Sequence, residues 1–188
     1  MHKKNWLVTG VFLLSLVMGV WYYKSHRIAQ LKRLLAAGQW QKADEKTSEI
    51  MLRETNRDIL GKLDFIGGHN SMATFRCQKL REIDELWLKY SQGRFGFSVQ
   101  QSIWQSIFEK RQMADFEEYS EFAIEVGWQK NKSAKNFQRT FTLEAPQGHL
   151  PSFDWMMKTS PSGSIWMHDG VTIFSRVKNC KINTSKFD

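Results

Sequence analysis

The longest run of apolar positions in the chain extends from Trp6 to Tyr23 without a charged residue. As a helix, these 18 residues would span about 27 Å, enough to cross the hydrocarbon core of a membrane. Aromatic residues stand at both ends of the run, where amphipathic rings prefer the membrane–water interface. Lys24 and Arg27 follow closely, which makes a poor site for signal-peptide cleavage. The pattern therefore predicts a retained membrane anchor rather than a cleaved signal peptide.

After residue 27, apolar positions recur at the three- and four-residue spacing of amphipathic helices. The stretches predicted to be helical are residues 28–37, 40–51, 75–90, 98–107 and 114–126. We expect Gly38 and Gly127 to end two of these helices in the left-handed conformation, and Ser98 to cap a third. The last apolar stretch, residues 171–177, fits a strand and a short helix equally well. The pattern predicts a mainly α fold, a compact all-helical domain that follows a single N-terminal transmembrane helix.

Charge and composition divide the chain into three predicted parts. These are an anchor with basic flanks at residues 1–27, a helix hairpin at 28–55, and the remainder of the domain at 56–188 with its core at 75–180. The net charge is +8, and the anchor region holds four basic residues and no acidic one. The rest is therefore only mildly basic, which argues against nucleic-acid binding. Four basic residues between 24 and 33 outnumber the two before the apolar run. This excess favours a single-pass membrane protein whose domain lies on the cytoplasmic (or stromal) side.

Motifs of catalysis and metal binding are missing from the sequence. It contains no P-loop, no GxGxxG and no GxSxG. His69, His149 and His168 are isolated, and Cys77 and Cys180 form no CxxC pair, so we expect neither a catalytic site nor a metal site. Two cysteines are also too few for a disulfide-stapled secreted scaffold. These absences favour a non-enzymatic binding or regulatory protein without an obligatory cofactor.

Three short strings are unusual in composition. The first, LWLKYSQGRFGFSVQ, places Arg94, Phe95 and Phe97 around two glycines just before a predicted helix. The others are VGW, which contains Trp128, and APQGHLP, which contains His149. Glycines let a backbone approach a partner closely, and aromatic rings supply flat contact area. The plainer interpretation of the first string is a turn between helices whose phenylalanines fill the core.

These strings resemble the genomes-uncoupled-four (Gun-four) family of porphyrin-binding domains in oxygenic phototrophs such as cyanobacteria. KYSQGRFGFSVQ and APQGHLP, in that order, carry the resemblance, and LKRLLAAGQW, FAIEVGWQ and FSRVKNC extend it over about residues 28–180. It implies an all-helical domain shaped like a cupped hand, which binds protoporphyrin IX or Mg-protoporphyrin IX. It further implies that the protein regulates magnesium chelatase in chlorophyll biosynthesis through the large, porphyrin-binding chelatase subunit, without inserting the metal itself.

A tetrapyrrole is a flat apolar plate with two anionic propionates at one edge, so its site needs apolar faces and basic residues at the edge. The residues predicted to bind it are Arg94, Phe95, Phe97, Val99, Trp128, Phe137, Arg139, Phe141, Leu143, His149, Leu150 and Trp155. Arg94 and Arg139 are candidates for the propionates. His149 has a second interpretation as a turn histidine bonded to the backbone, and any single aromatic residue could be ordinary core.

The predicted loop at residues 152–164 combines serines with large apolar residues, and we expect it to form a lid over the ligand. One alternative function keeps the fold but uses the hairpin at 28–55 to dock a protein partner at the membrane. A second alternative is the binding of a linear tetrapyrrole, a bilin. Covalent attachment of a bilin at Cys77 or Cys180 would need an exposed thiol, whereas free cysteines are usually buried.

Overall fold

The computed structural model describes residues 26–54, 75–111, 116–134, 137–152 and 173–183. In these ranges every regular element is a helix and no strand occurs, which confirms the predicted mainly α class there. The helices are residues 26–36, α2 (Trp40–Glu54), α3 (Cys77–Tyr90), α4 (Phe97–Arg111), α5 (Phe116–Glu125) and residues 173–179. The carboxy-terminal stretch that fits a strand and a helix equally well in sequence is thus helical from residue 173.

Several sequence predictions fall outside the described ranges. They concern the membrane anchor, the glycine-rich stretch at 56–74, Trp155 and the predicted lid beyond Ser152. Among the described residues, no helix is both long enough and apolar enough to span a membrane. The anchor and the lid therefore stay predictions.

The first helix and α2 form the predicted hairpin. Gly38 joins them with φ +64°, and its N–H donates to the carbonyl of Leu35 (3.0 Å), which confirms its predicted role at the helix end. Leu31 and Leu35 of the first helix are buried, as are the apolar positions along one face of α2. The hairpin is therefore part of the domain core and not a separate unit.

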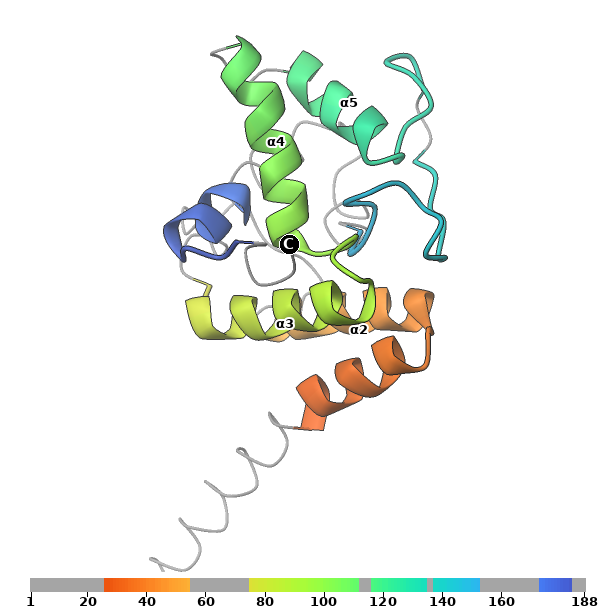
Figure 1. Ribbon diagram of the computed structural model, residues 1–188, viewed down its shortest axis with the longest axis vertical. Coiled ribbons are helices and arrows are strands. Elements are labelled where there is room, and N and C mark those ends of the chain that lie inside the picture. Colours follow the sequence, from red (N-terminus) through yellow and green to blue (C-terminus); the bar gives the residue numbers. More distant parts are fainter. Residues whose placement is uncertain (1–25, 55–74, 112–115, 135–136, 153–172, 184–188) are drawn as a thin grey trace, which may run out of the picture.

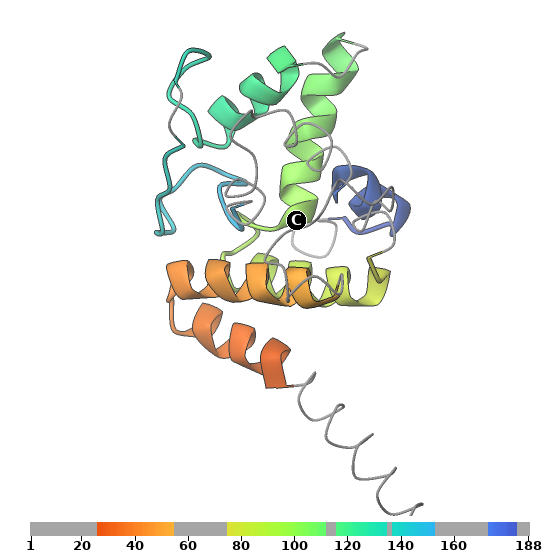
Figure 2. The ribbon, with the colours of Figure 1, turned by 180° about the vertical axis from the view of Figure 1, so that it is seen from behind.

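Helix α3 lies beside α2, and together they form a layer from which α4 rises (Figures 1 and 2). The contact between this layer and the start of α4 is aromatic. Trp40 of α2 stacks on Trp87 of α3 with ring centroids 6.2 Å apart, and Phe95 meets both rings edge-on. The buried indole N–H of Trp87 donates to Thr47 Oγ1 (3.0 Å), so burial leaves this donor satisfied. We call Trp40, Trp87 and Phe95 the hairpin cluster.

Helices α4 and α5 pack against each other on the far side of that layer (Figure 1). A second aromatic group lies between them and the helix at 173–179. Phe174 stacks on Trp104 with centroids 5.4 Å apart, and Phe122 meets Trp104, Phe174 and Trp128 edge-on. We call Trp104, Phe122, Trp128 and Phe174 the helix-pair cluster. It links the carboxy-terminal helix to Trp128, which lies three residues after the end of α5.

The amino terminus of α4 corrects one prediction. Ser98 does not stand outside the helix as its cap, because α4 begins one residue earlier, at Phe97. Instead the backbone N–H of Ser98 donates to Asp84 Oδ1 of α3 (2.9 Å). A buried carboxylate from the neighbouring helix thus satisfies a donor that a local cap would otherwise serve. Sequence spacing cannot reveal a cap that comes from another helix.

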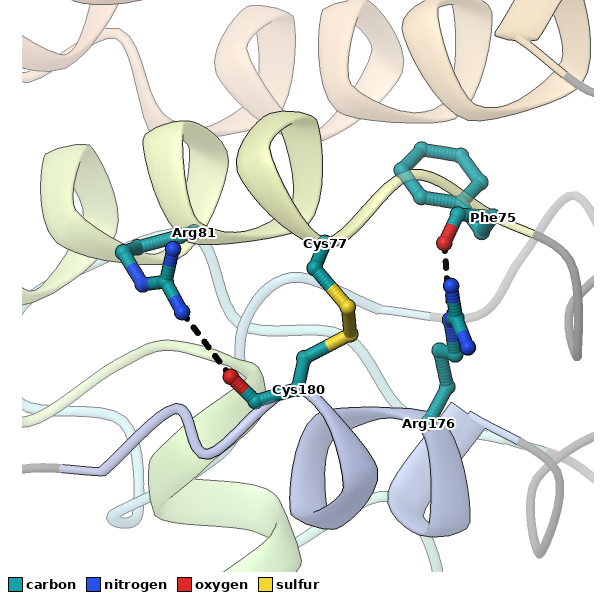
Figure 3. The surroundings of a disulfide bond; sticks show 5 residues. All are labelled: Phe75, Cys77, Arg81, Arg176 and Cys180. Atoms are coloured by element: carbon teal, nitrogen blue, oxygen red, sulfur yellow. Dashed lines mark hydrogen bonds between the residues drawn. A yellow bond between two sulfur atoms is a disulfide. The ribbon is translucent and has the colours of Figure 1, made fainter.

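The two cysteines form a disulfide, whereas the sequence analysis treated them as free thiols. Cys77, the first residue of α3, forms a disulfide with Cys180, which follows the carboxy-terminal helix (Figure 3). Their Cα atoms are 5.2 Å apart, although 103 positions separate them in the chain. Attachment of a bilin to either sulfur therefore requires prior reduction of this bond.

Candidate functional site

Three segments that the sequence analysis singled out come together in the structure. They are the glycine turn between α3 and α4 (residues 91–97), the end of α5 (126–128) and the turn at residues 145–152. Gly96 N–H donates to the carbonyl of Leu150 (3.0 Å), and Gly148 N–H donates to that of Arg94 (2.8 Å). The indole N–H of Trp128 donates to the carbonyl of His149 (2.8 Å). The strings that carry the family resemblance are thus neighbours in space.

Two polar side chains hold the 145–152 turn against α4. Arg94 Nη2 donates to the carbonyl of Ala145 (2.7 Å). The side-chain amide of Gln100, which is fully buried, donates to the carbonyls of Gly148 and Pro151, both at 2.8 Å. The backbone between these anchors includes a cis Leu150–Pro151 peptide bond. Arg94 therefore contributes to loop structure, a role that its prediction as a propionate partner did not include.

A third anchor comes from the hairpin. Asp44 of α2 accepts hydrogen bonds from the backbone N–H (2.6 Å) and the hydroxyl (2.5 Å) of Ser152. Both residues are buried, and 108 positions separate them in sequence. Hydrogen bonds to an ionised acceptor are about twice as strong as neutral ones. Asp44 therefore fixes the end of the turn to the hairpin.

Five of the predicted site residues belong to the core. Their side chains are almost completely buried, and the five are Phe95, Phe97, Val99, Trp128 and Leu150. Phe95 is part of the hairpin cluster and Trp128 of the helix-pair cluster, so each is surrounded by protein rather than facing a surface. In this conformation these five side chains are part of the core.

His149 is buried between three backbone segments. Thr140 N–H donates to its Nε2 (2.8 Å), so Nδ1 carries the proton and donates to the carbonyl of Val126 (2.6 Å). Desolvation lowers the pKa of His149, the bond to Val126 opposes this, and the nearby positive charge of Arg139 lowers the pKa further. The neutral ring thus ties the end of α5 to residue 140. The interpretation as a turn histidine bonded to backbone is confirmed.

Four further predicted residues lie on the irregular segment from residue 137 to 144, which ends in a turn at 142–145. From residue 137 to 144 the side chains alternate strictly between half-buried and exposed. The half-buried set is Phe137, Arg139, Phe141 and Leu143, and we call it the 137–143 row. This alternation of burial indicates that the four lie on the same side of the segment. The row combines three apolar side chains that rest on the core with one guanidinium.

Two backbone hydrogen bonds hold the segment of the 137–143 row in place. Gln138 N–H donates to the carbonyl of Trp128 (2.8 Å), and Thr140 N–H donates to His149. Gln138 and Thr140 are two of the three positions between row members, and their backbone donors bond to the protein while their side chains stay exposed. The segment thus presents partly accessible apolar groups on a fixed backbone, which suits a flat ligand.

Two anchors of the turn escaped the sequence analysis. Asp44 reads as an exposed helix acid, and Gln100 as part of a polar stretch in α4, until the fold brings the 145–152 turn next to them. The sequence held one sign of their burial, because Asp44 and Gln100 each lie on the buried face of their helix. Asp44 follows Ala43 and precedes Thr47, both of which are buried.

Comparisons with known proteins identify relatives of this chain. The profile of the GUN4-like family matches residues 23–169. The ligand-free structure of Arabidopsis thaliana GUN4 superposes with a TM-score of 0.60 at 26% identity, and the match covers 78% of this chain and 93% of that one. GUN4 from Chlamydomonas reinhardtii shares the fold, with a TM-score of 0.56 at 19% identity over 80% of this chain and 86% of that one.

Sequence relatives with curated names agree with these matches. A Ycf53-like protein of Synechocystis is 28% identical over 169 residues, which is 85% of this chain and 63% of the relative. The chloroplastic tetrapyrrole-binding protein of Arabidopsis thaliana is 27% identical over 135 residues, 64% of this chain and 46% of the relative. The chain thus spans about half to three-fifths of the length of these proteins.

Proposed function

Since its profile matches residues 23–169, the chain belongs to the GUN4-like family, and on that premise we propose that it is a non-enzymatic tetrapyrrole-binding protein. A relative in Arabidopsis thaliana bears the name tetrapyrrole-binding protein, which supports the ligand class. We further propose protoporphyrin IX or Mg-protoporphyrin IX as the ligand, because the family resemblance implies it. The proposed partner is the large, porphyrin-binding subunit of magnesium chelatase, at a membrane that the predicted amino-terminal anchor would reach.

The 137–143 row is the observation that carries this proposal. Phe137, Phe141 and Leu143 offer a half-buried apolar surface of the kind that one face of a porphyrin requires. Arg139 lies between the two phenylalanines in sequence and on the same side of the segment, where a propionate could receive its charge-assisted hydrogen bonds. The chemistry of the row therefore matches the two requirements of the ligand, a flat apolar contact and a cation near its edge.

The adaptor alternative receives less support from the hairpin. Among the described residues, the large hydrophobic side chain that is exposed is Phe108 of α4, and none lies on the hairpin. Trp40, Ile50 and Met51 of α2 are buried in the common core. The hairpin carries the partly buried apolar residues Ile28, Leu34 and Leu52, which fall in the same burial class as the apolar members of the 137–143 row. The row differs because it also holds a guanidinium, which suits a porphyrin with anionic propionates.

Titration with protoporphyrin IX tests the proposal. The full-length chain in mild detergent should shift the Soret band of the ligand in a saturable manner. Phe141→Ala should weaken binding by about tenfold, because removing a ring from an apolar contact costs roughly 1.5 kcal/mol. Arg139→Gln should weaken binding of protoporphyrin more than binding of its dimethyl ester, which lacks the anionic groups.

Thr140→Ala is the matched control, since its side chain is exposed on the other side of the segment and its backbone bond to His149 remains. It should bind as the wild type does. Absence of a saturable Soret shift with the wild-type chain would refute tetrapyrrole binding. A normal shift that neither Phe141→Ala nor Arg139→Gln affects would place the ligand elsewhere.

A further inference from the structure

The disulfide between Cys77 and Cys180 encloses the described domain apart from the hairpin in one covalent loop. Helices α3, α4 and α5, the 137–143 row and the 145–152 turn all lie within the 103 positions between the two sulfurs. The bond joins the first residue of α3 to the residue after the helix at 173–179 (Figure 3). A change in this one bond thus acts at the junction of two helices.

The surroundings of the bond differ for its two halves. Cys180 is only 5% exposed, whereas Cys77 is half-buried and is the more exposed residue of the pair. Two arginines flank the pair: Arg81 Nη2 donates to the carbonyl of Cys180 (2.8 Å), and Arg176 Nε donates to that of Phe75 (2.7 Å). Both guanidinium groups are visible beside the bond in Figure 3. Cationic neighbours stabilise a thiolate and so make it a better leaving group.

We propose that Cys77–Cys180 is a thiol–disulfide exchange site whose partner is a dithiol oxidoreductase of the CxxC type. The attacking thiolate of the partner forms a bond to Cys77 Sγ, the Cys77–Cys180 bond breaks, and Cys180 leaves as a thiolate beside Arg81. The second thiolate of the partner then attacks the partner's own sulfur in the mixed disulfide, and Cys77 leaves as a thiolate. The amino-terminal position of Cys77 on α3 favours that charge.

This sequence balances without a further reagent. Two electrons and two protons pass from the partner's dithiol to Cys77 and Cys180, which end as thiols, and the partner ends as a disulfide. The oxidised form of the same class of partner drives the reverse reaction. A CxxC protein supplies both electrons in one encounter, whereas a monothiol would need two successive attacks at a pair of which one sulfur is buried.

Reduction would act on the helix-pair cluster. The carboxy-terminal helix is only seven residues long. Besides the disulfide, Arg81 of α3 bonds to the carbonyl of Cys180, and Arg176 of this helix bonds to that of Phe75, just before α3. Phe174 of this helix stacks on Trp104 and meets Phe122. Loss of the covalent tie should therefore loosen Phe174 from the cluster, and hydrogen exchange of residues 173–182 should become faster.

Trapping of the mixed disulfide tests the proposal on the oxidised full-length chain. The probe is a thioredoxin that keeps only its attacking cysteine. We expect a dithiothreitol-sensitive adduct whose peptide mass maps to Cys77. Wild-type thioredoxin, regenerated by its reductase, should then expose two thiols per chain to a maleimide–polyethylene glycol reagent. Cys180→Ser is the control, because without a disulfide there is no bond for the reduced probe to attack.

Two outcomes would overturn the proposal. One is a folded chain that yields neither adduct nor thiols, although the urea-unfolded chain yields both; the bond would then be inaccessible. The other is a chain that carries two reactive thiols after treatment with oxidised thioredoxin, which would mean that the pair does not form the bond. Neither readout involves a porphyrin, so this test and that of the proposed function can fail separately.

Discussion

The glycine turn and the 137–143 row are both rich in phenylalanine and each contains an arginine, yet the structure treats them differently. In the glycine turn, Phe95 and Phe97 are completely buried and Phe95 joins the hairpin cluster. In the row, Phe137 and Phe141 are only half-buried and rest on the core from outside. The first region therefore belongs to the core, and the second is the surface that we propose for the ligand.

In this aromatic-rich chain, the difference in burial separates core phenylalanines from those that a ligand could reach. Phe95 lies just before α4 and Phe97 is the first residue of that helix, and the core encloses both side chains. The row lies on an irregular segment whose side chains alternate between half-buried and exposed, and no strand pairs with it among the described residues. Such a segment can leave one row of apolar groups accessible to a ligand.

The largest contrast should appear in stability. Phe95→Ala should lower the free energy of unfolding by about 3–5 kcal/mol, because it leaves a cavity in the hairpin cluster. Phe141→Ala removes the same atoms from a half-buried position and should cost only about 1–2 kcal/mol. Urea unfolding followed by circular dichroism measures both. Equal losses would contradict the division into core and surface.

A glycine pair sharpens the comparison at the junction of the two regions. At Gly127 (φ +73°) an added Cβ would lie 2.6 Å from Pro146 Cγ, so Gly127→Ala should cost about 2–4 kcal/mol through strain and steric clash. Gly38→Ala is the control, since its φ is similar (+64°) but its nearest neighbouring atom is 3.9 Å away, and it should cost about 1 kcal/mol. If thermal unfolding shows the same loss for both, the close approach to Pro146 has no energetic weight.

The Asp44 anchor tests whether the turn belongs to the positioning region. Asp44→Asn keeps the shape but removes the charge from two buried hydrogen bonds to Ser152, and should lower stability by about 2 kcal/mol. Glu45→Gln changes an exposed neighbour on the same helix and should have an effect below about 0.5 kcal/mol. Chemical denaturation of the two variants provides the comparison. If Asp44→Asn leaves stability unchanged, the bonds between Asp44 and Ser152 do not hold the turn to the hairpin.

Asp84 gives an effect that depends on pH. Burial raises the pKa of Asp84 from 3.8 to about 6, although hydrogen bonds from Ser98 and Phe97 oppose the shift. The folded state therefore holds this proton more tightly than the unfolded state does. The stability that the proton confers is complete below pH 3.8 and is lost as the pH rises through about 6, a change of about 3 kcal/mol.

The Asp84→Asn variant isolates this contribution. His149 has a lowered pKa and so adds the opposite trend, because its contribution is present above pH 6.5 and is lost as the pH falls through the lowered pKa. The difference between wild-type and Asp84→Asn stability curves cancels that trend. We expect this difference to change steadily between pH 4 and 6. A difference that stays constant over this range would show that Asp84 does not titrate there.

Much of the fold follows from local pattern. The helices near residues 28, 40, 75, 98 and 114 were predicted with boundaries that differ from the structure by a few residues, because apolar spacing and the terminating glycines are local signals. The contacts that assemble the site are not local. The Asp84 cap, the Asp44 anchor and the disulfide join residues 14, 108 and 103 positions apart, and no spacing rule specifies them.

For the site, residue type alone could not separate support from contact. Phe95 and Phe141 are the same amino acid in similar company, and only the fold shows that one is enclosed and the other half-accessible. The string FQRTFTLE places Phe137, Phe141 and Leu143 at alternate positions, but the polar Arg139 interrupts the alternation, so the sequence alone does not single out the row.

The most direct measurement of the central claim is hydrogen exchange of the full-length chain with and without saturating protoporphyrin IX. Peptides that cover residues 137–143 should exchange more slowly when the ligand is bound, because the ligand covers the row. Peptides that cover residues 94–98 should exchange slowly in both states, because the core encloses them already. Unchanged exchange at 137–143 together with ligand-dependent protection at 94–98 would contradict the account and make the glycine turn the binding surface.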